Sequence, residues 1–412
     1  MRPSRPVLVL LTAAAAVALG GCGGGTTAAG PGKTTGTPAG NSGTAGTPVP
    51  STAPGGPPEG PPGTWTTGVR PAGAVTDGRT VAGTTRQPEG PTTAVALDAG
   101  TGATRWTVPL GDPGAATTGH ALLLSPGGPL VATWQQDTPG SGLTPASSTF
   151  RVARLDPQTG RPLWTATTSG PAVAAAPDVV LTEERQGDQT AARGTVALDP
   201  ADGHRLWTAS ADPVLVEQGT AVLTRQDLAV STVLTAVDAV TGTARWTSST
   251  WAVGAVGSRA TALTAAAGHL LVEASTTRLA GETTELRVRD VTTGQPVGPA
   301  LPAPHIPGAR HDRDDDIAVV HEKQEQGAGL GVYGVDMATG RQLWALDATQ
   351  ATQAAVAGGG LVWVKGKDGY VALDDRTGTV KAQGLDQAPV LVLDRTQIVD
   401  DGAVLRSGPL PG

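Results

Sequence analysis

The sequence predicts an all-β fold: an eight-bladed β-propeller whose blades are four-stranded antiparallel sheets. Three observations predict this fold. An eleven-residue pattern, first met as ALDAGTGATRW, recurs along the chain. Most copies end in a tryptophan, and the two ends of the chain each carry part of one further, incomplete copy. The alternative is a seven-bladed propeller in which the C-terminal strands only add to the first blade.

The recurring pattern is centred on an aspartate that follows an apolar strand. Its copies lie 38 to 58 residues apart, and a period of about 40 to 50 residues with variable insertions is typical of propeller blades. An alternating or wholly apolar stretch precedes the aspartate, as in TTAVALD. The seven aspartates are Asp98, Asp156, Asp199, Asp238, Asp290, Asp336 and Asp374.

A glycine four residues after the aspartate completes a turn between two strands. The aspartate carboxylate can accept hydrogen bonds from backbone N–H groups just ahead of it, and the glycine can take the positive φ that ends a bulged hairpin. Together they set the register of the two strands. The glycines assigned to this position are Gly102, Gly160, Gly203, Gly242 and Gly340.

A tryptophan eight residues after the aspartate is expected to end the second of these strands and to pack against the neighbouring blade. The chain has only one Phe and two Tyr, so a general demand for aromatic residues does not explain the position. An indole covers about 200 Å², worth up to about 5 kcal/mol, and its N–H can reach a carbonyl. Two copies depart from the pattern, with Gly298 and Ala382 in the tryptophan position. The expected blade-docking tryptophans are Trp65, Trp106, Trp164, Trp207, Trp246 and Trp344.

The two ends of the chain predict how the propeller closes. The tail APVLVLDRTQIVDDGAVLRS repeats three strands of a unit, and GTWTTG near the N-terminal side supplies a fourth, with Trp65 in the docking position. The last blade would then combine C-terminal strands with the N-terminal one, so that closure removes exposed sheet edges.

The pattern Ala-x-Asp-x-x-x-Gly-x-x-x-Trp resembles the docking motif of the PQQ-like, or quinoprotein-like, β-propeller repeat from about Trp65 to the C-terminus. In that family, a quinoprotein dehydrogenase has a vicinal disulfide over the quinone and an asparagine among its calcium ligands. This chain has one cysteine, Cys22, and its only asparagine is Asn41. The resemblance therefore implies the propeller fold, while these departures argue against a bound cofactor and against enzymatic activity.

Residues 1–21 are typical of a lipoprotein signal peptide, because Arg2 and Arg5 precede a short apolar stretch. The sequence Leu-Gly-Gly-Cys that ends at Cys22 resembles a bacterial lipobox, so Cys22 is the expected lipidation site. Residues 22–62, rich in Gly, Pro and Thr, predict a disordered tether. The propeller is expected over residues 63–412, extracytoplasmic and lipid-anchored to the cell membrane.

The charge and the motifs of the sequence argue against several classes of function. A net charge of −7 and a pI near 5.4 give no basic surface for nucleic acid. No nucleophile elbow or phosphate-binding loop supports catalysis. Alternate carboxylates at Asp312, Asp314 and Asp316 are a weak calcium candidate, because Ile317 and Lys323 occupy two later positions where a calcium loop has Gly and Glu. No metal site is assigned.

The longest insertions follow the second strand of several units, which places them on one rim of the propeller. The sequence therefore predicts a monomeric, non-catalytic scaffold that binds a protein or a cell-envelope polymer through this loop-rich face. One alternative is a component resembling the propeller lipoprotein of the outer-membrane β-barrel assembly machinery. The others are a sensor of a small molecule or glycan and, in last place, a PQQ-dependent dehydrogenase.

Overall fold

The computed structural model describes residues 64–86, 92–111, 116–124, 127–138, 140, 147–185, 194–227, 231–248, 257–278, 281–301, 303, 307–311, 316–322, 331–347, 349–351, 353–393, 396–402 and 404–411, which belong to one unit, Gly60–Gly412. These residues form strands and turns. In this part of the chain, no helix has the length and apolar character needed to cross a membrane. The expected signal peptide, the lipidation site Cys22 and the tether lie outside the described residues.

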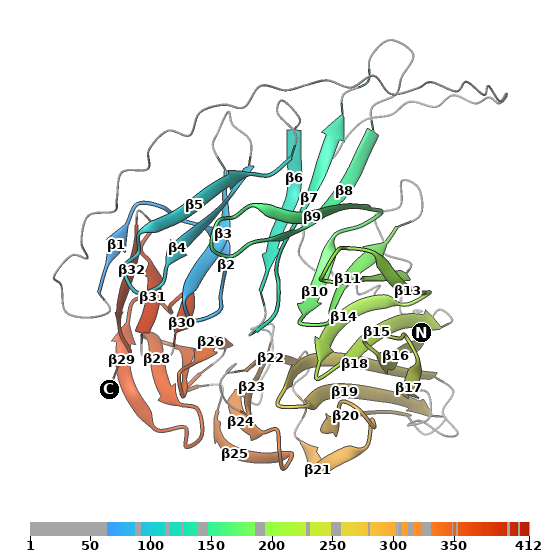
Figure 1. Cartoon of the computed structure of the whole chain (residues 1–412). Helices are drawn as coiled ribbons and strands as arrows, with labels where there is room; N and C mark the ends of the chain where they lie inside the picture. Colours follow the sequence, from blue (N-terminus) through green and yellow to red (C-terminus); the bar gives the residue numbers. More distant parts are fainter. Residues whose placement is uncertain are drawn as a thin grey trace, which may run out of the picture. The chain divides into compact units, whose positions relative to one another are not determined.

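Four-stranded antiparallel meanders are the repeating element of the fold (Figure 1). The first four meanders are β2 (Ala72–Thr76), β3 (Thr80–Arg86), β4 (Thr92–Asp98) and β5 (Thr104–Pro109); β6 (Ala116–Leu123), β7 (Leu130–Thr138), β8 (Ser147–Leu155) and β9 (Pro162–Thr168); β10 (Ala172–Ala176), β11 (Val179–Glu184), β12 (Gly194–Leu198) and β13 (Arg205–Ala209); and β14 (Asp212–Glu217), β15 (Thr220–Asp227), β16 (Ser231–Asp238) and β17 (Ala244–Thr247).

The remaining four meanders follow the same plan, except that the last one takes its fourth strand from the N-terminal side. They are β18 (Gly257–Ala266), β19 (His269–Arg278), β20 (Gly281–Asp290) and β21 (Pro296–Leu301); β22 (Pro307–His311), β23 (Ile317–Glu322), β24 (Val332–Asp336) and β25 (Arg341–Leu346); β26 (Gln353–Gly358), β27 (Leu361–Gly366), β28 (Gly369–Asp374) and β29 (Val380–Leu385); and β30 (Leu391–Leu393), β31 (Thr396–Asp400), β32 (Leu405–Pro409) and β1 (Thr66–Thr67).

The predicted all-β class and the four-stranded antiparallel sheets are confirmed. One departure is that the fourth and fifth meanders form a single eight-stranded sheet, joined by one parallel pair between Thr232 on β16 and Arg259 on β18. A second departure concerns the fourth strands, which do not end at the tryptophan. β5 continues past Trp106 to Pro109, because β4 still offers pairing partners as far as Thr93.

The first strands of successive meanders contact one another in chain order: β2, β6, β10, β14, β18, β22, β26 and β30. β30 in turn contacts β2. Such a series of contacts is what a closed ring of blades requires. The count of eight blades stays a prediction, which these contacts support.

The N-terminal strand β1 pairs with the C-terminal strand β32, with Thr66 opposite Arg406. Trp65 N–H donates to Ser407 Oγ at 3.0 Å, and Ser407 N–H donates to the Trp65 carbonyl at 2.9 Å. Nearby, the guanidinium of Arg70 donates to Asp400 at 2.8 Å. Residues from the two ends of the described chain thus complete one sheet.

The core is made of layers between neighbouring meanders. Val81 and Ala82 are adjacent on β3 and both fully buried. Ala82 packs with Leu130 of the second meander, whereas Val81 packs with Ile398 of the last one. Because successive side chains of a strand point to opposite faces, a middle strand that is covered on both faces needs an unbroken apolar run. This explains stretches such as AVAL before the recurring aspartate.

Candidate functional site

The predicted docking tryptophans all donate their indole N–H to the adjacent meander. In each case the acceptor is the backbone carbonyl of the residue that follows the next recurring aspartate along the chain. The donor–acceptor pairs are Trp65 and Ala99 at 2.9 Å, Trp106 and Pro157 at 2.9 Å, Trp164 and Pro200 at 2.8 Å, Trp207 and Ala239 at 2.9 Å, Trp246 and Val291 at 2.8 Å, and Trp344 and Asp375 at 2.6 Å.

The glycine of the same turn lies under the indole ring. A Cβ atom on Gly160 would lie 2.5 Å from Cε3 of Trp106, and Gly160 has φ +71°. The other turn glycines share this left-handed conformation: Gly102 (φ 68°), Gly203 (φ 78°), Gly242 (φ 70°) and Gly340 (φ 65°), together with Gly294 (φ 70°) and Gly378 (φ 68°). The last two belong to the copies of Asp290 and Asp374, and they contact Trp246 and Trp344.

The recurring aspartate organises the turn through both carboxylate oxygens, as Asp238 shows. Its Oδ1 accepts from the Thr241 backbone N–H at 2.9 Å and from Thr241 Oγ1 at 3.0 Å. Its Oδ2 accepts from the Arg245 guanidinium at 2.8 Å. The Thr241 backbone donor and the Arg245 donor lower the pKa of Asp238 to about 2. Asp98 has the same arrangement, with Thr101 and Arg105 as donors.

The other aspartates of the pattern also accept backbone hydrogen bonds within their turns. Asp156 Oδ1 accepts from Gln158 N–H at 2.8 Å, Asp199 Oδ1 from Ala201 N–H at 2.6 Å, and Asp336 Oδ1 from Ala338 N–H at 2.9 Å. All lie at the junction of the third and fourth strands of their meanders. These turns therefore share one rim, which leaves the connections between second and third strands on the other.

Of the two copies that lack tryptophan, the one at Gly298 replaces the indole with a direct backbone contact. Gly298 stands in the tryptophan position of the fifth meander, and Gly340 is the turn glycine of the sixth. A side chain on Gly298 would overlap the Thr339 carbonyl, and one on Gly340 would overlap the Val297 carbonyl. The two hairpins thus meet where no side chain fits.

Of the weak calcium candidate, only Asp316 lies within the described residues. Asp312 and Asp314 lie outside the described residues. Asp316 Oδ1 accepts from Arg376 Nη2 at 2.8 Å, in the turn of the seventh meander. In a calcium loop, this carboxylate oxygen would point at the ion. Here it binds the guanidinium of Arg376 instead.

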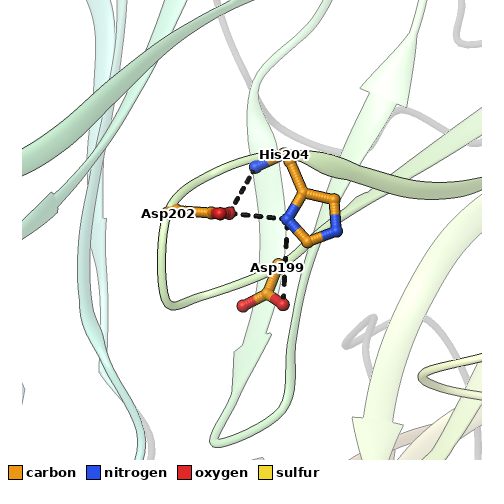
Figure 2. Close-up of side chains that lie close together, drawn as sticks. All are labelled: Asp199, Asp202 and His204. Atoms are coloured by element: carbon orange, nitrogen blue, oxygen red, sulfur yellow. Dashed lines mark hydrogen bonds and ion pairs between the residues drawn. The ribbon is translucent and has the colours of Figure 1, made fainter.

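A different group of potential metal ligands lies in the turn of the third meander, at a place where no metal site is predicted from the sequence. Figure 2 shows Asp199, Asp202 and His204 side by side. His204 Nδ1 lies 2.6 Å from Asp202 Oδ1 and 3.8 Å from Asp199 Oδ2. The hydrogen bond to Asp202 raises the pKa of His204. The spacing Asp-x-x-Asp-x-His is the feature of the sequence that could have indicated this group. The side chains of Asp202 and His204 are 66% and 56% exposed, so solvent meets the group from most sides.

The longer connections predicted after the second strands do occur there. They join β7 to β8, β11 to β12 and β23 to β24, and most of their residues lie outside the described part of the chain. The strand ends that carry them are described. Thr138 pairs with Ser147 at the end of the β7–β8 hairpin, and Arg278 pairs with Gly281 at the end of the β19–β20 hairpin.

Solved structures similar to this chain include BamB from Moraxella catarrhalis, which is 16% identical over 83% of this chain and 97% of that chain, with a TM-score of 0.46. The dihydro-heme d1 dehydrogenase NirN is 15% identical over 80% of this chain and 70% of that chain, with a TM-score of 0.47. The quinohemoprotein alcohol dehydrogenase ADHIIG from Pseudomonas putida HK5 is 12% identical over 81% and 73%, with a TM-score of 0.43. None of the curated proteins matches the chain.

The family comparison covers the part of the chain that contains most of the recurring turns. A family model described as outer membrane protein assembly factor BamB matches residues 93–329, which is more than half of the 412 residues. The matched segment includes the copies at Asp98, Asp156, Asp199, Asp238 and Asp290. The predicted PQQ-like repeat is thereby confirmed, and the chain belongs to the family of outer membrane protein assembly factor BamB.

Proposed function

We propose that this protein is a non-catalytic scaffold for assembly in the cell envelope, lipid-anchored through Cys22 on the extracytoplasmic side. It binds a protein partner through the rim formed by the connections between second and third strands. The family description, an outer membrane assembly factor, supports a protein partner over an envelope polymer. It also favours the assembly-machinery component that the sequence analysis gave as an alternative.

The length of two hairpins on this rim is the observation that carries the proposal. β7 and β8 each have nine residues, and β19 and β20 each have ten. The equivalent strands of the third meander, β11 and β12, have six and five. The long hairpins extend the sheets at the ends away from the Asp-Gly turns, and Figure 1 shows β7 and β8 as long strands that run side by side. Extended hairpins on a closed scaffold provide a broad, exposed surface for recognition.

Site-specific photo-crosslinking in living cells tests the proposed binding rim. A benzophenone amino acid at Thr138, which is exposed at the end of β7, is expected to give one or a few discrete crosslinked proteins. Gln158 is the matched control: it is also exposed, and it lies in the turn that follows the paired strand β8, on the opposite rim. Crosslinks of equal yield from both positions, or none from Thr138, would contradict the proposed rim.

The lipid anchor is tested in the same cells with Cys22→Ser. The expected result is loss of incorporated palmitate and a shift of the protein from the membrane fraction to the soluble extracytoplasmic fraction, because the acyl chains supply the membrane affinity. A Cys22→Ser chain that remained in the membrane fraction would show that another segment anchors the protein. The crosslinks from Thr138 are expected to weaken but to keep the same partners.

A further inference from the structure

The fifth meander has an arginine where the other copies of the pattern have a buried aliphatic side chain. The residue directly before the recurring aspartate is at most 6% exposed in six copies: Leu97, Leu155, Leu198, Val237, Val335 and Leu373. In the fifth copy this residue is Arg289, which is also buried, at 8% exposed. A permanently charged guanidinium thus replaces an apolar side chain in a layer between two meanders. Burying such a charge is costly unless other groups compensate for it.

Arg289 lies beside a cleft between the fourth and fifth meanders. The cleft has a volume of about 900 Å³ and lies between β17 and the turn that joins β20 to β21. The described residues that line it include three arginines and no carboxylate. The arginines are Arg225, Arg245 and Arg289, and the apolar part of the wall is formed by Ala244, Trp246 and Pro296.

Arg289 shares the carboxylate of Glu285 with a second guanidinium. Its Nη1 donates to the Gly294 carbonyl at 3.1 Å, and its Nη2 lies 3.8 Å from Glu285 Oε1. The same oxygen is ion-paired with Arg287, so that one carboxylate faces two guanidinium groups. Burial lowers the pKa of Arg289, which means that its surroundings disfavour the charged form. Arg245, which lines the cleft, is ion-paired with Asp238 at 2.8 Å, and Asp238 itself does not line the cleft.

We propose that this cleft binds an organic carboxylate, whose oxygens accept hydrogen bonds from Arg289 and whose apolar part lies against Trp246 and Pro296. A guanidinium matches a carboxylate through two parallel hydrogen bonds. The volume falls within the range of small-molecule sites, which are mostly apolar with a few polar groups that fix the orientation of the ligand. The apolar wall favours an organic acid over inorganic phosphate. This site is independent of the proposed partner-binding rim.

Saturation-transfer NMR on the full chain tests the cleft, with acetate, succinate and 3-phenylpropionate as probes at matched ionic strength. Inorganic phosphate has no carbon-bound protons, so its binding is followed by broadening of its phosphorus-31 signal. We expect transfer to 3-phenylpropionate and succinate at about 10 mM probe, a concentration that detects even millimolar affinity. Arg289→Leu is the decisive variant, because leucine is the residue of four other copies and fits the same buried position. It is expected to weaken binding of 3-phenylpropionate roughly tenfold or more while its Tm stays equal or rises.

A matched pair of variants separates the cleft from the general turn structure. Arg245→Gln in the cleft is expected to weaken binding. Arg105→Gln, which removes the equivalent partner of Asp98 in the first meander, is expected to leave binding unchanged. The proposal is overturned if none of the carboxylates shows transfer, if Arg289→Leu binds them as well as the wild type does, or if phosphate is the only probe that binds.

Discussion

At the scale of the residue, each docking indole joins two sheets through a single turn. Trp106 is 7% exposed, donates to the Pro157 carbonyl and lies over Gly160. A side chain on Gly160 would have to displace the ring, and its φ of +71° adds a backbone cost for any residue with a Cβ. The aspartate-to-glycine turn is therefore the site on which the tryptophan of the preceding meander packs.

Replacing one docking indole should destabilise the propeller by an amount typical of a buried aromatic side chain. Trp106→Ala removes the buried ring and leaves the Pro157 carbonyl without this donor, so we expect the free energy of unfolding to fall by about 3 to 5 kcal/mol. Urea unfolding measures the loss. Thr107→Ala changes the exposed neighbouring residue and is expected to alter stability by less than about 0.5 kcal/mol. Equal effects of the two variants would contradict the docking role.

At the scale of the element, the turn between the third and fourth strands holds the strand register. The carboxylate of Asp238 bonds to Thr241 on one side and to Arg245 on β17 on the other. The pairing of β16 with β17 shifts by one residue between Ala236 and Val237, just before this aspartate. Such an irregularity changes which residues of the two strands lie opposite each other. It places Trp246 opposite Ala236 on β16.

The ionised carboxylate of Asp238 should make stability depend on pH in the acid range. Its folded pKa of about 2 lies below the value near 3.9 of an unfolded chain. The contribution is therefore fully present above the unfolded value and is lost as the pH falls through the folded value. Asp238→Asn is expected to be less stable than the wild type at pH 7, with a difference that shrinks between about pH 5 and pH 2. Urea unfolding at a series of pH values measures this difference, and a constant difference would contradict the role of the charge.

At the scale of the whole molecule, the sheet built from β1 and β30–β32 ties the two sides of the described chain together. Trp65 and Ser407 are 342 positions apart and exchange two hydrogen bonds. Trp65 also donates to the Ala99 carbonyl of the first meander. Without β1, the edge of β32 would be unpaired, and an unpaired edge strand promotes association with other chains.

Removing the N-terminal strand should therefore affect both stability and oligomeric state. A chain that begins at Pro71 lacks Trp65 and β1, and we expect it to unfold at lower urea concentration and to self-associate. A chain that begins at Thr64 retains both and is the matched control, expected to remain stable and monomeric. Urea unfolding and analytical ultracentrifugation check the two outcomes. Identical behaviour of the two chains would show that the last sheet does not depend on β1.

The sequence by itself determined the repeating unit and its turn chemistry. The spacing of Asp98, Gly102 and Trp106 predicts two strands, a left-handed glycine and an indole at a set position, because each depends on neighbours within about ten residues. The incomplete copies at the two ends predict that β1 joins the C-terminal strands, since a strand without partners in its own unit must find them elsewhere.

Only the tertiary structure decided which contacts are made by residues that depart from the recurring pattern or lie outside it. Gly298 meets Gly340 backbone to backbone, Asp316 binds Arg376 of the next meander, and Arg289 lies beside a cleft. The arginine at position 289 is evident from the sequence. That its side chain is buried beside a cleft is not, because an arginine in this position could also have pointed to solvent. These outcomes depend on which residues of two separately folded hairpins come into contact. Distances between sheets are set by the summed packing of all the blades, which no local pattern contains.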